Sequence, residues 1–110
     1  MTQPLSREFV DSLREYRREL DSLDAQFVAL LAARFSITQR IGALKASNGV
    51  EAADLAREQA QLERLVALSD DLGLPSEVTC AVYRTLFRFV RANHLAQAAA
   101  ASAALVEADE

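Results

Sequence analysis

The sequence has few of the residues that interrupt helices or build sheets. Its 110 residues include three glycines, two prolines, two tyrosines and five phenylalanines. Alanine, leucine, glutamate and arginine are abundant instead, and these residues favour helices. The scarcity of β-branched and aromatic residues argues against a sheet. The composition therefore predicts an all-α protein, and the length suffices for one domain with one core.

Cysteine, histidine and net positive charge are also scarce. Cys80 is the only cysteine, which excludes an intrachain disulfide and favours a reducing compartment. One cysteine and one histidine cannot supply the four ligands of a structural zinc site, so we expect no metal. A formal net charge of −4 argues against a general nucleic-acid binder, which needs a basic face to offset phosphate.

Long apolar runs are missing as well. The longest, Phe27–Ala33, is much shorter than the roughly 20 residues that span a bilayer. The chain starts with polar and acidic residues and lacks the basic start and apolar core of a secretory signal. We therefore predict a soluble cytoplasmic protein that has no membrane partner.

One very long helix is predicted in the first half of the chain. A three-four apolar spacing ends at Asn48-Gly49, a helix-stop signal, and predicts a helix over about Ser6–Ser47. Such a helix is about 60 Å long, whereas a compact chain of this size has a radius of gyration of about 13 Å. A partner chain is therefore predicted to cover its apolar stripe. The stripe consists of Leu13, Tyr16, Leu20, Leu23, Phe27, Leu30, Ile37, Ile41 and Leu44.

Two further helices are predicted. Asp54 is a good N-cap for the second helix, Gly73 stops it, and Pro75 marks the first turn of the third. Residues 98–110 are rich in alanine and are expected to extend the third helix or to fray. We predict a single domain over residues 1–110 with a core of about 7–97. The apolar stripes are Leu55, Leu62, Leu65, Val66 and Leu72 in the second helix, and Val78, Val82, Leu86, Phe89 and Val90 in the third.

Polar residues interrupt these stripes. Arg34 falls where an apolar residue is expected, Lys45 lies three turns further along, Glu58 occupies the first turn of the second helix, and His94 follows Val90 by four residues. Singly, each has an ordinary structural explanation: a buried ion pair, a helix-capping lysine, a carboxylate paired with a nearby arginine, a hydrogen-bonded core histidine. Together they predict a lining for a small organic anion that carries a hydroxyl or amino group.

The chain resembles the all-helical, AroQ-type chorismate mutases. The segment LREYRRELDSLDAQFVALLAARFSITQRIGALKASNG has the arginine, leucine-aspartate pair, second arginine and G-x-x-K ending typical of their first helix. The segment DLAREQAQLERL resembles the D-x-x-R-E segment that opens their second helix. The resemblance covers roughly residues 13–97 without a gap. It implies an intertwined homodimer of three-helix chains.

The resemblance also implies roles for individual residues. Arg17 and Arg34 would hold the two carboxylates of the substrate. Lys45 would donate a hydrogen bond to the breaking ether oxygen. Asp54, through its backbone, and Glu58 would lie near the C4 substituent of the ring.

Two positions depart from the family pattern. Val90 stands where the family usually has a serine near a substrate carboxylate, and His94 stands where it usually has a glutamine that donates to the ether oxygen. A shift of three residues would place Asn93 and Gln97 there but needs an insertion, so we keep the ungapped alignment. Arg57 matches the arginine of the D-x-x-R-E segment.

The implied reaction is the Claisen-type rearrangement of chorismate to prephenate, which needs no nucleophile, metal or cofactor. A first alternative is 4-amino-4-deoxychorismate as substrate, because Glu58 suits a C4 ammonium. A second is isochorismate-pyruvate lyase activity, against which Glu58 counts. A third is a non-catalytic helical dimer, which the presence of Arg17, Arg34, Lys45 and Glu58 together disfavours.

Helix geometry requires a second copy if Arg17 and Lys45 serve the same site. The two residues are 28 positions apart, which is about 42 Å along one helix. A small substrate touches both only if a second chain runs antiparallel. A two-fold axis near Phe27–Leu30 would then generate two equivalent sites, each shared between the chains.

Overall fold

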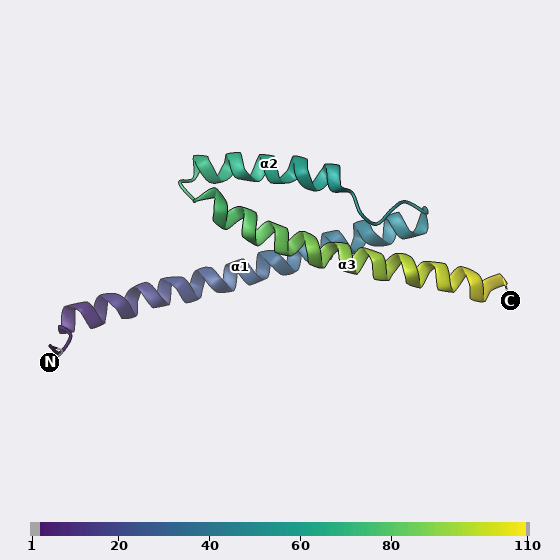
Figure 1. Cartoon of the computed structure of the whole chain (residues 1–110). Helices are drawn as coiled ribbons and strands as arrows, with labels where there is room; N and C mark the ends of the chain where they lie inside the picture. The colour runs from purple at the N-terminus through teal and green to yellow at the C-terminus, as the bar shows by residue number, and fades with distance from the viewer. Residues whose placement is uncertain (1–2, 110) are drawn as a thin grey trace. The chain divides into compact units, whose positions relative to one another are not determined.

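The structure, a computed structural model, describes residues 3–109 and contains three helices (Figure 1). They are α1 (Arg7–Ser47), α2 (Leu55–Asp71) and α3 (Ser76–Asp109), and the described residues form no strand. The all-α prediction is confirmed, and the helices begin and end close to the predicted positions. The alanine-rich tail continues α3 as a helix.

The helix ends follow from local chemistry. Asp54 is the N-cap of α2, and its Oδ1 accepts a hydrogen bond from the backbone N–H of Arg57 at 3.0 Å. Gly49 follows α1 with a φ of 65°, and Gly73 follows α2 with a φ of 70°. Both lie in the left-handed region that glycine adopts without steric strain, which explains why the chain turns at these two positions.

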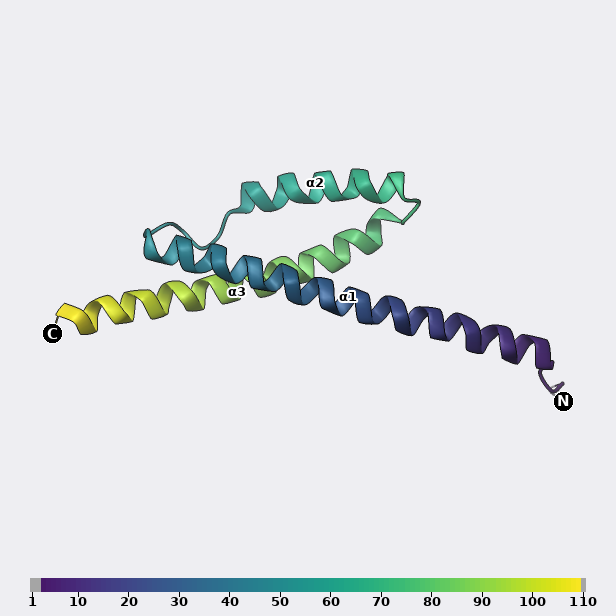
Figure 2. The ribbon, with the colours of Figure 1, turned by 180° about the vertical axis from the view of Figure 1, so that it is seen from behind.

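Internal contacts divide the chain into two units, and the boundary falls inside α1, between Phe35 and Ser36. The second unit contains the last turns of α1 together with α2 and α3. Both views show α2 alongside the first half of α3 (Figures 1 and 2). This pairing forms the core of the second unit.

The core of the second unit is small and partly polar. Leu65 and Phe87 are 8% and 6% exposed, and the ring of Phe87 lies 6.0 Å from that of Tyr83. Ser69 and Thr79 are buried and bonded through their hydroxyls. The Ser69 hydroxyl donates to the Leu65 carbonyl at 3.0 Å, so Thr79 must donate to Ser69. This side-chain bond ties α2 to α3.

Several residues of the predicted apolar stripes of α2 and α3 are exposed in the single chain. Leu55 and Leu72, at the two ends of α2, are 67% and 73% exposed, and Val78 in the first turn of α3 is 48% exposed. Phe89 is 65% exposed, whereas Phe87 is buried. Two residues apart on a helix means a rotation of about 200°, so only one of these phenylalanines can face α2.

The first unit is the part of α1 up to Phe35, and its predicted apolar stripe is uncovered. Leu20, Leu23, Phe27 and Leu30 are 56%, 58%, 50% and 69% exposed. Burial of one such side chain is worth about 1.5–3 kcal/mol. No described residue within this unit supplies that burial, because the unit contains a single helix.

Among the described residues, α1 is the one helix whose length and composition would allow it to cross a membrane. Its most apolar window of 18 residues has a mean hydropathy of 1.3, and 6% of that window is buried. The uninterrupted apolar run Phe27–Ala33 gave too low an impression of the apolar character of α1. The mean hydropathy over 18 residues stays high even where a few charged residues are included. Length and composition do not distinguish a membrane span from a helix whose stripe another protein chain covers.

Candidate functional site

The last turns of α1 contact α3 at Gly42, which is buried. A Cβ there would lie 1.8 Å from Oε1 of Gln97 and 2.6 Å from Cδ2 of His94, so glycine permits the close approach. Nε2 of His94 lies 2.7 Å from the carbonyl oxygen of Thr38. Nε2 of Gln97 donates to the carbonyl oxygen of Gln39 at 2.9 Å. Two side chains of α3 thus bind the backbone of α1.

This contact uses a different face of α1 from the apolar stripe. Thr38 and Lys45 are half-buried, whereas Ile37, Ile41 and Leu44 are 52%, 42% and 65% exposed. The α3-facing side of α1 is therefore small and polar, and the apolar stripe remains uncovered in the second unit as well.

His94 points inward as predicted and is 6% exposed. Because a carbonyl oxygen only accepts, the Nε2 atom of His94 must carry the hydrogen that it shares with Thr38. In a neutral ring Nδ1 is then an acceptor, and it donates to a ligand only when the ring is an imidazolium. The geometry is that of a hydrogen-bonded core histidine, and its role as an ether-oxygen donor stays a prediction.

Gln97, the alternative donor, lies against the same turns of α1. Its Oε1 atom and the Oδ1 atom of Asn93 are buried and have no hydrogen-bond partner among the described residues. Buried polar atoms usually have a hydrogen-bond partner, and the described residues supply none for these two oxygens. The Gln97 amide also carries a second N–H besides the one that binds Gln39. Both residues therefore remain candidates for contacting a ligand.

Glu58 forms an ion pair with Arg91 that joins α2 to α3. The Arg91 side chain is 36% exposed and that of Glu58 is 20% exposed. A nearby arginine was the ordinary structural explanation for Glu58 in the sequence, which did not single out Arg91. The signal was present: Phe87, Arg91 and His94 recur at four- and three-residue spacing, which is one face of a helix.

The remaining predicted residues of the second unit lie at helix ends or on α3. Lys45 is half-buried near the end of α1, and its Nζ donates to the carbonyl oxygen of Ala52 at 3.5 Å. An ammonium has three hydrogens, so two remain for a ligand. Arg57 is exposed beside the cap residue Asp54, and Val90 is half-buried.

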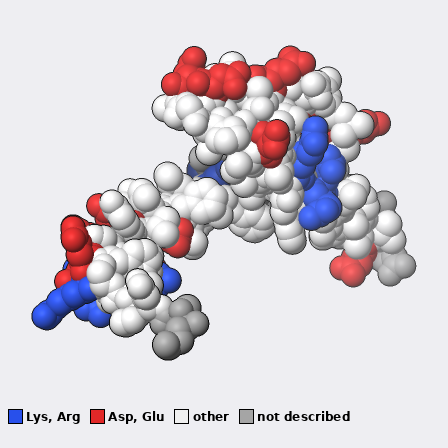
Figure 3. All heavy atoms as spheres, turned by 60° about the vertical axis from the view of Figure 1, so that its left-hand side comes forward, with Lys and Arg blue, Asp and Glu red and all other residues white. Residues whose placement is uncertain are grey.

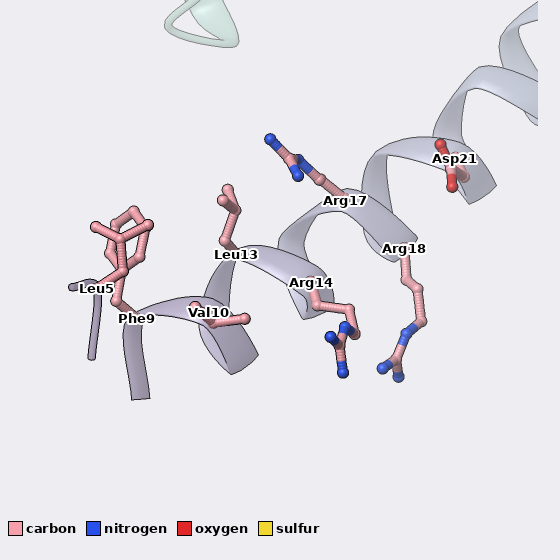
Figure 4. Close-up of a pocket in the computed structure, with 8 residues that line it drawn as sticks. All are labelled: Leu5, Phe9, Val10, Leu13, Arg14, Arg17, Arg18 and Asp21. Atoms are coloured by element: carbon pink, nitrogen blue, oxygen red, sulfur yellow. The ribbon is translucent and has the colours of Figure 1, made fainter. Parts of the chain in front are cut away.

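The two predicted carboxylate-binding arginines lie on the part of α1 in the first unit. Arg34 is half-buried and Arg17 is exposed. Arg17 borders an open hollow of about 430 Å³, where it points to the opposite side of the helix from Arg14 and Arg18 (Figure 4). Apolar residues line the same hollow, including Phe9. The hollow is thus formed by one helix and combines apolar side chains with a cation.

Apart from Glu58, which pairs with Arg91 of α3, the acidic residues of α2 are exposed. Figure 3 shows a row of acidic side chains along the outward side of α2. Glu63, Asp70 and Asp71 of this helix are exposed. These three carboxylates are therefore solvated and do not line the contact between α2 and α3.

Comparison with known proteins identifies the class. Residues 16–95 match the family chorismate mutase type II. The chain therefore belongs to the chorismate mutase type II family. The predicted family is thereby confirmed.

The chain is also similar to the T-protein of Haemophilus influenzae, with 28% identity over 85 residues. That alignment covers 77% of this chain and 22% of the T-protein, so the chain spans about a fifth of the length of this relative. The roles of single residues stay predictions.

Proposed function

We propose that the protein rearranges chorismate to prephenate in the cytoplasm, as a soluble enzyme. The observation that carries the proposal is the family match over residues 16–95, which includes all four of Arg17, Arg34, Lys45 and Glu58. The reaction is a Claisen-type shift in which one C–O bond breaks while one C–C bond forms within the same molecule. The side chains therefore need to hold, orient and stabilise, and no metal or cofactor is required.

The proposed site holds the substrate through its two carboxylates. A guanidinium binds a carboxylate through two parallel hydrogen bonds, which suits Arg17 and Arg34. Fixing both carboxylates places the enolpyruvyl side chain over the ring and removes most of the orientational freedom that opposes the reaction. Val90 supplies an apolar contact near one carboxylate, where the family usually has a serine.

Stabilisation of the developing charge on the ether oxygen falls to donors near the end of α1. Lys45 is the first donor. The second is Gln97 through its amide, or His94 through Nδ1 when its ring is an imidazolium, since Nε2 already binds the Thr38 carbonyl. Pre-oriented donors of this kind act on the charge that grows in the transition state. At the other side of the ring, Glu58 accepts a hydrogen bond from the C4 hydroxyl, and the backbone of Asp54 adds a contact beside Arg57.

The proposed enzyme is an intertwined homodimer. Arg17 and Lys45 are about 42 Å apart along α1, so a single chain cannot place both at one substrate. An antiparallel copy of α1 with the two-fold axis near Phe27–Leu30 brings the Arg17 end of one chain to the Arg34–Lys45 end of the other. The exposed stripe of α1 supports this arrangement, because the same pairing covers it.

A second candidate substrate is 4-amino-4-deoxychorismate, since the Glu58 carboxylate also suits a C4 ammonium. A spectrophotometric assay of the purified protein with each substrate separates the two. We expect a higher kcat/KM with chorismate. Conversion of the amino analogue alone would replace chorismate by that substrate, and conversion of neither would refute the proposed activity.

The shared site is tested by mixing two inactive variants. Chains with Arg17→Ala and chains with Lys45→Ala are unfolded together and refolded. Each heterodimer then has both lesions in one site and none in the other. With random pairing about a quarter of all sites are intact, so about a quarter of the activity should return.

The matched control mixes Arg34→Ala with Lys45→Ala. These residues are 11 positions apart on the same face of α1 and serve the same site from the same chain. Every heterodimer site then carries one lesion, and no activity should return. Recovery in this control, or none in the first mixture although heterodimers form, would contradict the shared site.

A further inference from the structure

Glu58, the group proposed to face the C4 substituent, already has a cationic partner within its own chain. Its Oε1 atom accepts a hydrogen bond from Nη1 of Arg91. Both side chains are partly screened from water, with 20% of Glu58 and 36% of Arg91 exposed. The partner comes from α3, whereas Glu58 belongs to the first turn of α2. The pair is thus a contact between helices at the proposed site.

The ion pair with Arg91 changes which C4 substituent the Glu58 carboxylate favours. A carboxylate has about four lone-pair positions, so Glu58 still accepts a hydrogen bond while it holds Arg91. The charge of the guanidinium, however, opposes a second cation at the same carboxylate, and partial burial weakens the screening of that repulsion. A C4 hydroxyl needs only a carboxylate oxygen of Glu58 that accepts its hydrogen bond. A C4 ammonium would also need the negative charge of Glu58, which Arg91 already balances.

We infer that Arg91 is a specificity-determining residue that makes the site prefer an uncharged C4 hydroxyl over a C4 ammonium. This inference rests on the proposed function, because it takes Glu58 to face C4. Arg91 acts through Glu58 rather than by touching the substrate. The chain thereby has its own element of discrimination between chorismate and its 4-amino analogue.

The test replaces Arg91 with methionine, which has similar length and no charge, and measures kcat/KM for chorismate and for 4-amino-4-deoxychorismate. The ratio of the kcat/KM for the amino substrate to that for chorismate should rise about fivefold, the upper end of what one exposed charge pair contributes. Arg91→Lys keeps the charge and should hold the ratio within about twofold of the original protein. Arg88→Met is the matched control, because Arg88 is exposed one turn earlier on α3.

Glu58→Gln provides the second background. If Arg91 acts through Glu58, Arg91→Met should change the ratio much less in the Glu58→Gln protein than in the original one. If Arg91→Met folds poorly, Arg91→Gln replaces it in both backgrounds, because glutamine removes the charge and still offers a polar contact to α2.

Several outcomes would overturn the inference. An unchanged ratio in Arg91→Met, or an equal fall with both substrates, would make Arg91 a structural clamp only. A preference of the original protein for the ammonium substrate would contradict the inference and leave the family's reaction type intact. Failure of the original protein to convert either substrate would instead remove the proposed function, and the inference with it.

Discussion

The two units of the chain treat similar apolar sequences differently. Beyond Ser36, α2 and α3 cover each other and bury Leu65 and Phe87. Before that residue, α1 exposes half or more of Leu20, Phe27 and Leu30. The helical pattern is as regular in the first unit as in the second. Periodicity therefore predicts a helix in both, but only the contacts decide whether the chain alone can bury the stripe.

The largest effect is expected at the centre of the exposed stripe. Phe27→Asp should abolish dimer formation and lower activity by at least about 100-fold, because it places an unpaired carboxylate from each chain beside the proposed axis. Analytical ultracentrifugation and the chorismate assay measure the two effects. Ala25→Asp adds the same charge about 160° around the helix, and should affect assembly far less. An active dimer of the Phe27 variant would refute the proposed pairing.

The core of the second unit provides the next largest effect. Phe87→Ala should lower the free energy of unfolding by about 3–5 kcal/mol, the range for phenylalanine in a packed core. Phe89→Ala removes the same atoms from a residue that is 65% exposed, and should cost about 0.5 kcal/mol or less. Urea unfolding at one fixed chain concentration compares the two. Similar losses in both variants would mean that α3 has a different buried face.

A third comparison concerns the two donors that hold α1 to α3. If His94 donates to the ether oxygen, His94→Ala should lower kcat on the order of 10- to 1000-fold, as for other lost donors to a developing oxyanion. His94→Gln should keep much of the activity. A thermal melt separates this loss from the loss of the Thr38 contact. Normal turnover in His94→Ala with a large fall in Gln97→Ala would assign the role to Gln97.

The smallest expected effect is at the helix crossing. Gly42→Ala should destabilise the protein by about 1–3 kcal/mol, because the new methyl group meets the His94 ring and the Gln97 amide. The Gln97 end is flexible, so Gln97→Ala should relieve part of that cost when the two changes are combined. Thermal unfolding of the two single variants and the double variant measures this coupling. Additive effects would show that Gln97 is not the obstacle.

The number, type and ends of the helices could be predicted from the sequence because local chemistry sets them. The Asp54 cap and the stops at Gly49 and Gly73 act within a few residues. The buried face of α3 could not be predicted this way, because both Phe87 and Phe89 fit a helical stripe. Only packing against α2 distinguishes them.

The candidate site shows the same limit. Arg17, Arg34 and Lys45 were found through a pattern along one helix, without knowledge of their surroundings. The partner of Glu58 was missed because Arg91 is distant in sequence and an arginine on a helix usually lies in solvent. The contact of His94 with the Thr38 carbonyl was missed because every residue has a backbone carbonyl, so residue type does not indicate which one accepts a hydrogen bond.

The dimer that we propose to cover the exposed stripe of α1 would have a consequence for gene dosage. An enzyme whose fold is completed by a second copy gains stability by mass action, so the assembled fraction depends on how many chains the cell makes. At low expression the activity would fall more steeply than the amount of protein. Doubling a scarce transcript would accordingly more than double the amount of assembled enzyme, until nearly all chains are paired.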